Sequence, residues 1–90
     1  HWSDEELLSH IVELKCRDRG LTILPDLPNC RSLDCSANQL SSLPNLPHCQ
    51  QLYCCKNKLT LLPDLPNCQK LECRDNQLSR LPNLPNCQNL

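Results

Sequence analysis

The chain has 90 residues, enough for one small domain. Its nine basic and ten acidic residues nearly cancel, which gives no electrostatic reason to expect nucleic acid or an anionic membrane as a partner. No apolar run approaches the roughly 18 residues that a membrane-spanning helix needs. Leucine and cysteine supply most of the apolar residues, while Phe and Met are absent. Because a compact core normally mixes shapes and aromatic rings, this composition indicates a core built of identical layers.

The N-terminal segment carries the signals of a short helix. Ser3 and Glu6 form a capping box, and Trp2 stands where a hydrophobic staple would contact Leu7. The apolar stripe of this segment consists of Leu7, Leu8, Ile11 and Val12. We expect a helix over residues 4–10 that lies on the first repeat and shields its edge. A helix that docks onto a partner is the alternative.

Beyond this segment the chain repeats itself every 19 residues, a period typical of repeat architectures. All eight prolines and eight of the nine cysteines fall on this period, and Cys55 alone stands outside it. The ladders of apolar residues are Leu14, Leu33, Leu52, Leu71 and Leu90; Cys16, Cys35, Cys54 and Cys73; and Cys30, Cys49, Cys68 and Cys87. Around Leu33 apolar and polar residues alternate, which predicts one short half-buried strand in each unit.

The second half of each unit reads L-P-x-L-P and cannot form a helix, because the paired prolines fix φ and remove amide donors. We expect an extended return segment, in which leucines such as Leu43 and Leu46 point toward the core. One strand and one return segment make one coil of a solenoid, and stacked coils place their strands in a parallel sheet.

The whole unit is C-x-x-L-x-C-x-x-N-x-L-x-x-L-P-x-L-P-x, and over residues 11–90 it resembles the leucine-rich repeat, with Cys in place of two leucines. The L-P-x-L-P phrase is similar to the bacterial effector class of that family, although the unit is one residue shorter. L-P-x-L-P-x-C is similar to repeat proteins of giant DNA viruses. The resemblance implies an α/β-type, mostly β solenoid with a parallel sheet on its concave face. Residues 1–12 would form a capping helix, and residues 13–90 about four coils.

Asn38, Asn57 and Asn76 occupy one position of the unit, where the chain leaves the strand. Backbone groups turn inward there without ladder partners, and a buried Asn side chain can bond them within and between units. The first unit has Arg19-Gly20 instead, and we expect Gly20 to make that turn with a positive φ.

Three interpretations of the repeated cysteines stay open, of which we favour the first. They pack as small apolar residues at positions that the family fills with leucine. Alternatively, neighbours such as Cys30 and Cys49 form disulfides, since in-register strands bring their Cα atoms into range. Finally, thiolates of adjacent units bind zinc, although no C-x-x-C pair occurs and the C-x4-C spacing on a strand separates the sulfurs widely.

The last residue, Leu90, falls on the core position of a fifth strand, and no capping segment follows it. We therefore expect the solenoid to be open at its C-terminal end. The chain begins with His1 rather than Met, so we expect a piece of a longer protein. Either further repeats follow, or this end stacks on another chain, as in a structural protein of a virion or filament.

Strand alternation points a second set of residues outward, on the face opposite the leucines and cysteines. The candidate partner-binding residues are Lys15, Arg17, Asp34, Tyr53, Cys55, Lys56, Glu72 and Arg74. Tyr53 is the one aromatic residue among them and sits centrally, between opposite charges, and Tyr and Arg dominate the energetics of many interfaces. The resemblance implies a non-catalytic module that binds another protein across this face. A solvated face of mixed charge is the plain alternative.

Enzymatic motifs are missing from the sequence: there is no glycine-rich phosphate loop, no nucleophile beside a base and no pair of catalytic carboxylates. We therefore expect no catalytic site, no bound metal and no cofactor. Many unpaired thiols favour a reducing, intracellular compartment, which for a viral protein is the host cytoplasm or the virion.

Overall fold

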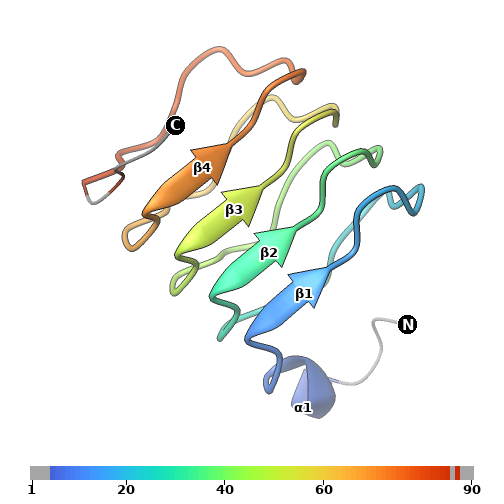
Figure 1. The fold of residues 1–90 in the computed structure, drawn as a ribbon, viewed down its shortest axis with the longest axis vertical. Helices are drawn as coiled ribbons and strands as arrows, with labels where there is room; N and C mark the ends of the chain where they lie inside the picture. Colours follow the sequence, from blue (N-terminus) through green and yellow to red (C-terminus); the bar gives the residue numbers. More distant parts are fainter. Residues whose placement is uncertain (1–4, 86, 88–90) are drawn as a thin grey trace.

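A four-stranded parallel sheet dominates the computed structural model, which describes residues 5–85 and residue 87 (Figure 1). The strands are β1 (Glu13–Lys15), β2 (Ser32–Asp34), β3 (Gln51–Tyr53) and β4 (Lys70–Glu72), and they lie side by side in chain order. Each strand residue pairs with the residue 19 positions later, as in the row Leu14, Leu33, Leu52 and Leu71. The fold is mostly β with little helix, and the predicted parallel sheet is confirmed.

Backbone pairing continues beyond these three-residue strands. The amides of Cys16, Cys35 and Cys54 each donate to a carbonyl of the next unit at 2.8 Å. Two residues further on, the amide of Asp18 donates to the carbonyl of Ser36 at 3.0 Å. Because every unit has the same length, a given amide meets the same position in the next unit, and this keeps the strands in register.

The segments between the strands run back behind the sheet, as Figure 1 shows. None of them contains a helix within the described residues after Leu8. Leu27, Leu46 and Leu65 of the L-P-x-L-P phrases are at most 1% exposed, and Leu43 is half-buried against the core. The prediction of non-helical return segments with inward leucines is confirmed for these residues.

The N-terminal helix α1 (Glu5–Leu8) is a single turn and is shorter than the predicted helix over residues 4–10. The hydroxyl of Ser9 donates to the carbonyl of Glu6 at 2.7 Å, and the next two amides bond carbonyls three residues back. Such bonds tighten the last turn and satisfy carbonyls that a longer helix would use. The predicted capping residue, Ser3, lies outside the described residues.

Half of the predicted apolar stripe packs on the sheet. Leu8 is 7% exposed and belongs to the core, and Ile11 packs against it. Leu7 and Val12, in contrast, are 65% and 54% exposed, so their assignment to the stripe was wrong. Successive helix residues point about 100° apart, and one turn that buries Leu8 leaves Leu7 on its outer side. Trp2, the expected staple partner, lies outside the described residues.

Layers of leucine and cysteine fill the interior, as the composition indicated. The buried cysteines are Cys16, Cys30, Cys35, Cys49, Cys54 and Cys68, while Cys73 and Cys87 of the last described unit are half-buried. Packing as small apolar residues is therefore confirmed for the repeated cysteines. Cys30 and Cys49 are thiols rather than the disulfide pair of the second interpretation. Leu90 lies outside the described residues.

The repeated asparagines hold the turn that follows each strand. The side-chain amide of Asn57 donates to the carbonyls of Cys35, Cys54 and Cys55, and its oxygen accepts the amide of Leu40 at 3.0 Å. The asparagines one unit before and one unit after make equivalent bonds. Each side chain thus links its own unit to the preceding one, which confirms the predicted role.

The residue before each of these asparagine positions has a left-handed backbone, which the sequence did not indicate. The φ angles are 58° at Asp18, 59° at Ala37, 58° at Lys56 and 59° at Asp75. Gly20 has a φ of 65°, as predicted for the first unit. Non-glycine residues adopt this conformation rarely, so the surrounding hydrogen bonds must impose it.

Candidate functional site

The outward surface of the sheet, which we call the strand face, is the candidate site. Three rows of side chains cross it: Glu13, Ser32, Gln51 and Lys70; Lys15, Asp34, Tyr53 and Glu72; and Arg17, Ser36, Cys55 and Arg74. Alternation along the strand places these rows opposite the buried leucines and cysteines. The repeat therefore fixes the backbone of the face while its side chains differ from unit to unit.

The eight predicted partner-binding residues all lie on or beside this face. Lys15, Arg17, Lys56 and Arg74 are exposed, whereas Asp34, Tyr53, Cys55 and Glu72 are half-buried. Lys56 alone is off the three rows, at a turn of left-handed backbone. The sheet thus gathers residues that are up to 59 positions apart in the chain, from Lys15 to Arg74.

Tyr53 occupies the middle row, and its environment differs from the predicted one. Its two register neighbours, Asp34 and Glu72, are both acidic rather than opposite in charge. The positive charge comes from the adjacent row, where the ammonium of Lys70 lies 5.6 Å from the ring centroid. A cation in this position is attracted to the ring face by about 0.5–1 kcal/mol at an exposed site.

The charged residues that the first two units place on the strand face pair with one another. Arg17 Nη1 lies 3.7 Å from Asp34 Oδ2, and Lys15 Nζ lies 3.7 Å from Glu13 Oε2. The other oxygen of Asp34 accepts the amide of Ser36 at 3.2 Å. Exposed ion pairs of this kind contribute roughly 0–1 kcal/mol, because water competes for both partners. They orient the side chains more than they stabilise the fold.

The two middle residues of the third row are largely buried. Ser36 is 4% exposed, and its hydroxyl accepts the amide of Cys55 at 3.1 Å. Cys55 is half-buried and stands outside the core cluster, consistent with its outward direction on the strand. The row is therefore open to a ligand mainly at its exposed ends, Arg17 and Arg74.

Burial raises the pKa of the core thiols. The pKa of Cys49 rises from the ordinary 9.0 to about 12, chiefly through burial and secondarily through the neighbouring sulfurs of Cys30 and Cys68. Burial is also the main cause of the raised pKa values of Cys35 and Cys54. Protonated, buried thiols are poor nucleophiles and poor metal ligands. Within residues 5–85 and 87, no group of three or more His, Cys, Asp or Glu could hold a metal ion.

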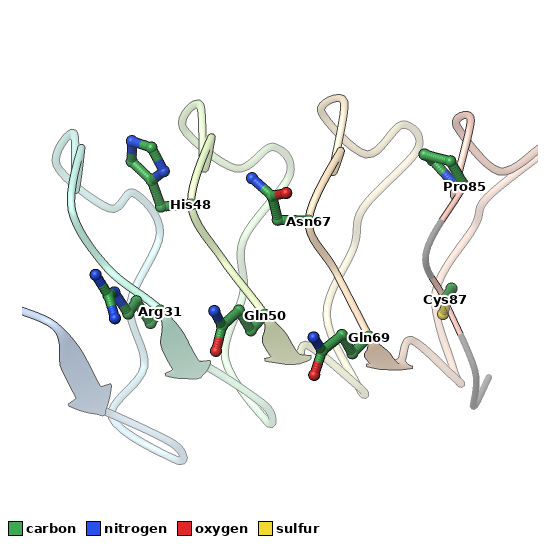
Figure 2. Close-up of a pocket in the computed structure, with 7 residues that line it drawn as sticks. All are labelled: Arg31, His48, Gln50, Asn67, Gln69, Pro85 and Cys87. Carbon is green, nitrogen blue, oxygen red and sulfur yellow. The ribbon is translucent and has the colours of Figure 1, made fainter.

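A second surface lies where the strands begin, outside the eight candidate partner-binding residues. It is a groove of about 460 Å³, which we call the edge groove (Figure 2). One row of its lining holds His48 and Asn67, the next row holds Arg31, Gln50 and Gln69, and the far end holds Pro85 and Cys87. The second row stands directly before β2, β3 and β4.

A smaller hollow of about 370 Å³ adjoins the edge groove toward the N-terminus. Arg31 and His48 line both of them, and His10 lines the smaller one. The sequence holds a signal for this site. Arg31 replaces the glutamine of the two following units, and His48 replaces the asparagine that the units on either side carry.

Comparison with known proteins gives no family assignment: no protein-family model matches the chain, and no curated protein matches it. The described residues include no helix that is long and apolar enough to span a bilayer. Function is therefore inferred from the strand face and the edge groove and from the side chains that line them.

Proposed function

We propose that the chain is a non-catalytic interaction module, a solenoid of the leucine-rich-repeat type that binds another protein across the strand face. The 19-residue register of the parallel strands supports this architecture, because it repeats one unit along one axis. The position of Tyr53 carries the functional proposal. Its half-buried ring lies in the middle row, and charged residues of both signs surround it.

The chemistry of the face defines the partner. An aromatic ring surrounded by charged groups is suited to anchor an interface, because the surrounding contacts exclude water from the anchor. Arg74 is exposed and forms no ion pair within the described residues, whereas Arg17 pairs with Asp34. We expect the partner to place an apolar group against Tyr53 and an acidic group near Arg74.

A selection from a displayed library of peptides and small domains tests this proposal, because it requires no partner to be identified beforehand. Binders are selected on the wild-type chain, and their affinities are then measured on the double variant Tyr53→Ala/Arg74→Ala. We expect the affinities to fall more than tenfold, since Tyr and Arg anchors typically account for about 2 kcal/mol or more each. Circular dichroism verifies that the double variant keeps the fold.

The matched control changes two exposed apolar residues on the return segments, Ile23→Ser and Leu61→Ser, which are 69% and 55% exposed in the wild type. This control should leave the affinities unchanged. Binders that lose affinity on the control but not on the strand-face variant would show that the chain binds through its return segments, contrary to the proposal.

A further inference from the structure

Two departures from the repeat meet at one end of the edge groove. His10, Asn29, His48 and Asn67 are spaced by 19 and share one position of the unit. Arg31 belongs to the unit between those of His10 and His48, at the position that Gln50 and Gln69 fill in the next two units. His10, Arg31 and His48 all line the smaller hollow, and Asn29 occupies the position between the two histidines in their row.

His48 lacks the structural role that asparagine has at this position. The side-chain amide of Asn29 donates to the carbonyl of Ser9 at 2.8 Å, and that of Asn67 donates to the carbonyl of Pro47 at 3.0 Å. Both bonds tie one unit to the preceding one. The His48 side chain makes no such bond to the described residues, so its ring nitrogens remain open to a ligand.

Arg31 supplies the positive charge at this end of the groove. The guanidinium of Arg31 pairs with no carboxylate in the described part of the chain. Among the described residues, none that lines either hollow is acidic. On the strand face, Arg17 and Lys15 have carboxylate partners, whereas Arg74 has none among the described residues. An anion in the groove would supply the partner that the fold does not.

The groups present determine the chemistry of this anion. A guanidinium donates two parallel hydrogen bonds to a carboxylate or phosphate, and this geometry suits no other common ligand group as well. An imidazole carries at least one N–H donor in every protonation state. Arg31, His10 and His48 thus supply hydrogen-bond donors to one hollow, where an oxyanion could accept from them.

The rest of the groove suits an extended chain attached to that anion. Gln50, Asn67 and Gln69 continue the lining away from Arg31, as Figure 2 shows. Primary amides both donate and accept, which matches the alternating N–H and C=O groups of a peptide backbone. Neighbouring units repeat about every 4.8 Å and an extended segment advances about 3.3 Å per residue, so the amides of neighbouring units can contact peptide groups one or two residues apart.

We propose that the edge groove and the adjoining smaller hollow bind an extended peptide, with a carboxylate or phosphate of that peptide held by Arg31, His10 and His48 in the smaller hollow. This site is separate from the strand face and does not depend on the function proposed for it.

Nuclear magnetic resonance titration of the ¹⁵N-labelled chain tests the site with four probes. Three are capped pentapeptides of alanine with a central phosphoserine, glutamate or serine, and the fourth is inorganic phosphate. We expect saturable shifts at His10, Arg31 and His48 with the two anionic peptides, and at least tenfold weaker binding of the serine peptide. The anionic peptides should also shift the side-chain amides of Gln50 and Gln69, which inorganic phosphate should leave unchanged.

Variants that restore the repeat provide the controls. Arg31→Gln and His48→Asn introduce residues that other units already carry, so the fold should persist, and each should weaken binding of the phosphoserine peptide about tenfold. Arg80→Gln, which changes an exposed arginine on a return segment, should leave it unchanged. Wild-type affinity of the Arg31→Gln/His48→Asn variant would overturn the proposal, as would shifts that never saturate. Inorganic phosphate that binds as tightly as the phosphoserine peptide would show a site for the free ion rather than for a peptide.

Discussion

The strand face and the edge groove are built from the same units, yet the charged side chains on the two surfaces have different neighbours. On the strand face, Arg17 pairs with Asp34 and the ammonium of Lys70 lies over the ring of Tyr53. In the edge groove, Arg31 and His48 stand beside amides and have no acidic neighbour among the described lining residues. Arg74 is the exception on the strand face, since it forms no ion pair within the described residues, and an uncompensated cation on either surface attracts an anion.

The two surfaces also differ in how they depart from the repeat. Every unit carries different side chains in the middle row of the strand face, from Lys15 to Glu72. The edge groove follows a regular pattern of glutamine and asparagine that is broken at Arg31 and His48. In a repeat protein an isolated break in a regular position is therefore as informative as a variable row.

The largest expected effect comes from the interior that both surfaces share. Asn57→Ala removes the side chain that satisfies the amide of Leu40 and three carbonyls, one of them in the preceding unit. The Leu40 amide is left without a partner, which costs about 1–3 kcal/mol. Each of the three carbonyls keeps one other hydrogen bond, and each bond lost to Asn57 costs about 0.5–1.5 kcal/mol. We expect a loss of at least ~3 kcal/mol in the free energy of unfolding, measured by urea denaturation, and simultaneous loss of both surfaces in amide spectra.

Asn67→Ala is the matched control for Asn57→Ala, because Asn67 is exposed and donates one bond, to the carbonyl of Pro47. Its loss should cost at most ~1 kcal/mol. Equal losses for the two variants would mean that the buried asparagines do not hold the units together. Edge-groove signals that outlast those of the strand face would mean that the two surfaces unfold independently.

The buried thiols predict the second largest effect, at alkaline pH. Below pH 9.0 the thiol of Cys49 is protonated in both the folded and the unfolded chain, so its contribution to stability is fully present. Above that value the unfolded chain releases the proton while the folded chain keeps it up to about pH 12. Stability should fall as pH rises through this window, by about 1.4 kcal/mol per pH unit for one thiol.

Urea denaturation of the wild type and of Cys49→Ala between pH 8 and pH 11 measures this contribution. The variant should be less stable than the wild type at every pH. The slope of its unfolding free energy against pH should be smaller by the equivalent of one proton, because the other titrating groups are the same in both chains. If the unfolding free energies of the two proteins run parallel across this pH range, the pKa of Cys49 is not raised in the folded chain.

A third prediction tests the charge difference between the two surfaces directly. Asp34→Ala removes the partner of Arg17 and the acceptor of the Ser36 amide, and should lower the free energy of unfolding by about 1–2 kcal/mol. Arg31→Gln should change it by less than about 0.5 kcal/mol, since that guanidinium contributes nothing to the fold. A destabilisation by Arg31→Gln as large as that by Asp34→Ala would show that the groove cation has a structural partner.

The repeat period allowed much of the fold to be predicted. One spacing of 19 residues correctly gives the parallel register of Leu14, Leu33 and Leu52, and substitution of cysteine for leucine correctly gives the burial of Cys35 and Cys54. The same alternation correctly places seven of the eight candidate residues on the outward rows, whereas Lys56 lies at the left-handed turn that follows them. These features follow from local pattern alone, because identical units repeat one environment.

Features that depend on several units at once could not be predicted in this way. The helix α1 ends early because Ser9 and the residues after it must turn into β1, and this constraint belongs to the connection rather than to the helix pattern. The smaller hollow beside the edge groove is lined by His10, Arg31 and His48, although each belongs to a different unit. A comparison of the units with one another, position by position, would have identified the last two residues.

The smallest expected effect concerns the left-handed turns where the strand face ends. At Ala37, with a φ of 59°, an alanine bears strain that glycine would not, so Ala37→Gly should raise the free energy of unfolding by up to about 1 kcal/mol, less the extra chain entropy of glycine. At Gly20, with a φ of 65°, no atom lies within 4 Å of an added Cβ, so Gly20→Ala should cost a similar amount through backbone strain alone. Opposite changes in the melting temperature of the two variants would show that the backbone at Ala37 is strained. The hydrogen bonds of Asn38, whose side-chain amide donates to the carbonyls of Cys35 and Ser36, would then impose the turn. If both variants are destabilised alike, the left-handed backbone at Ala37 is not strained.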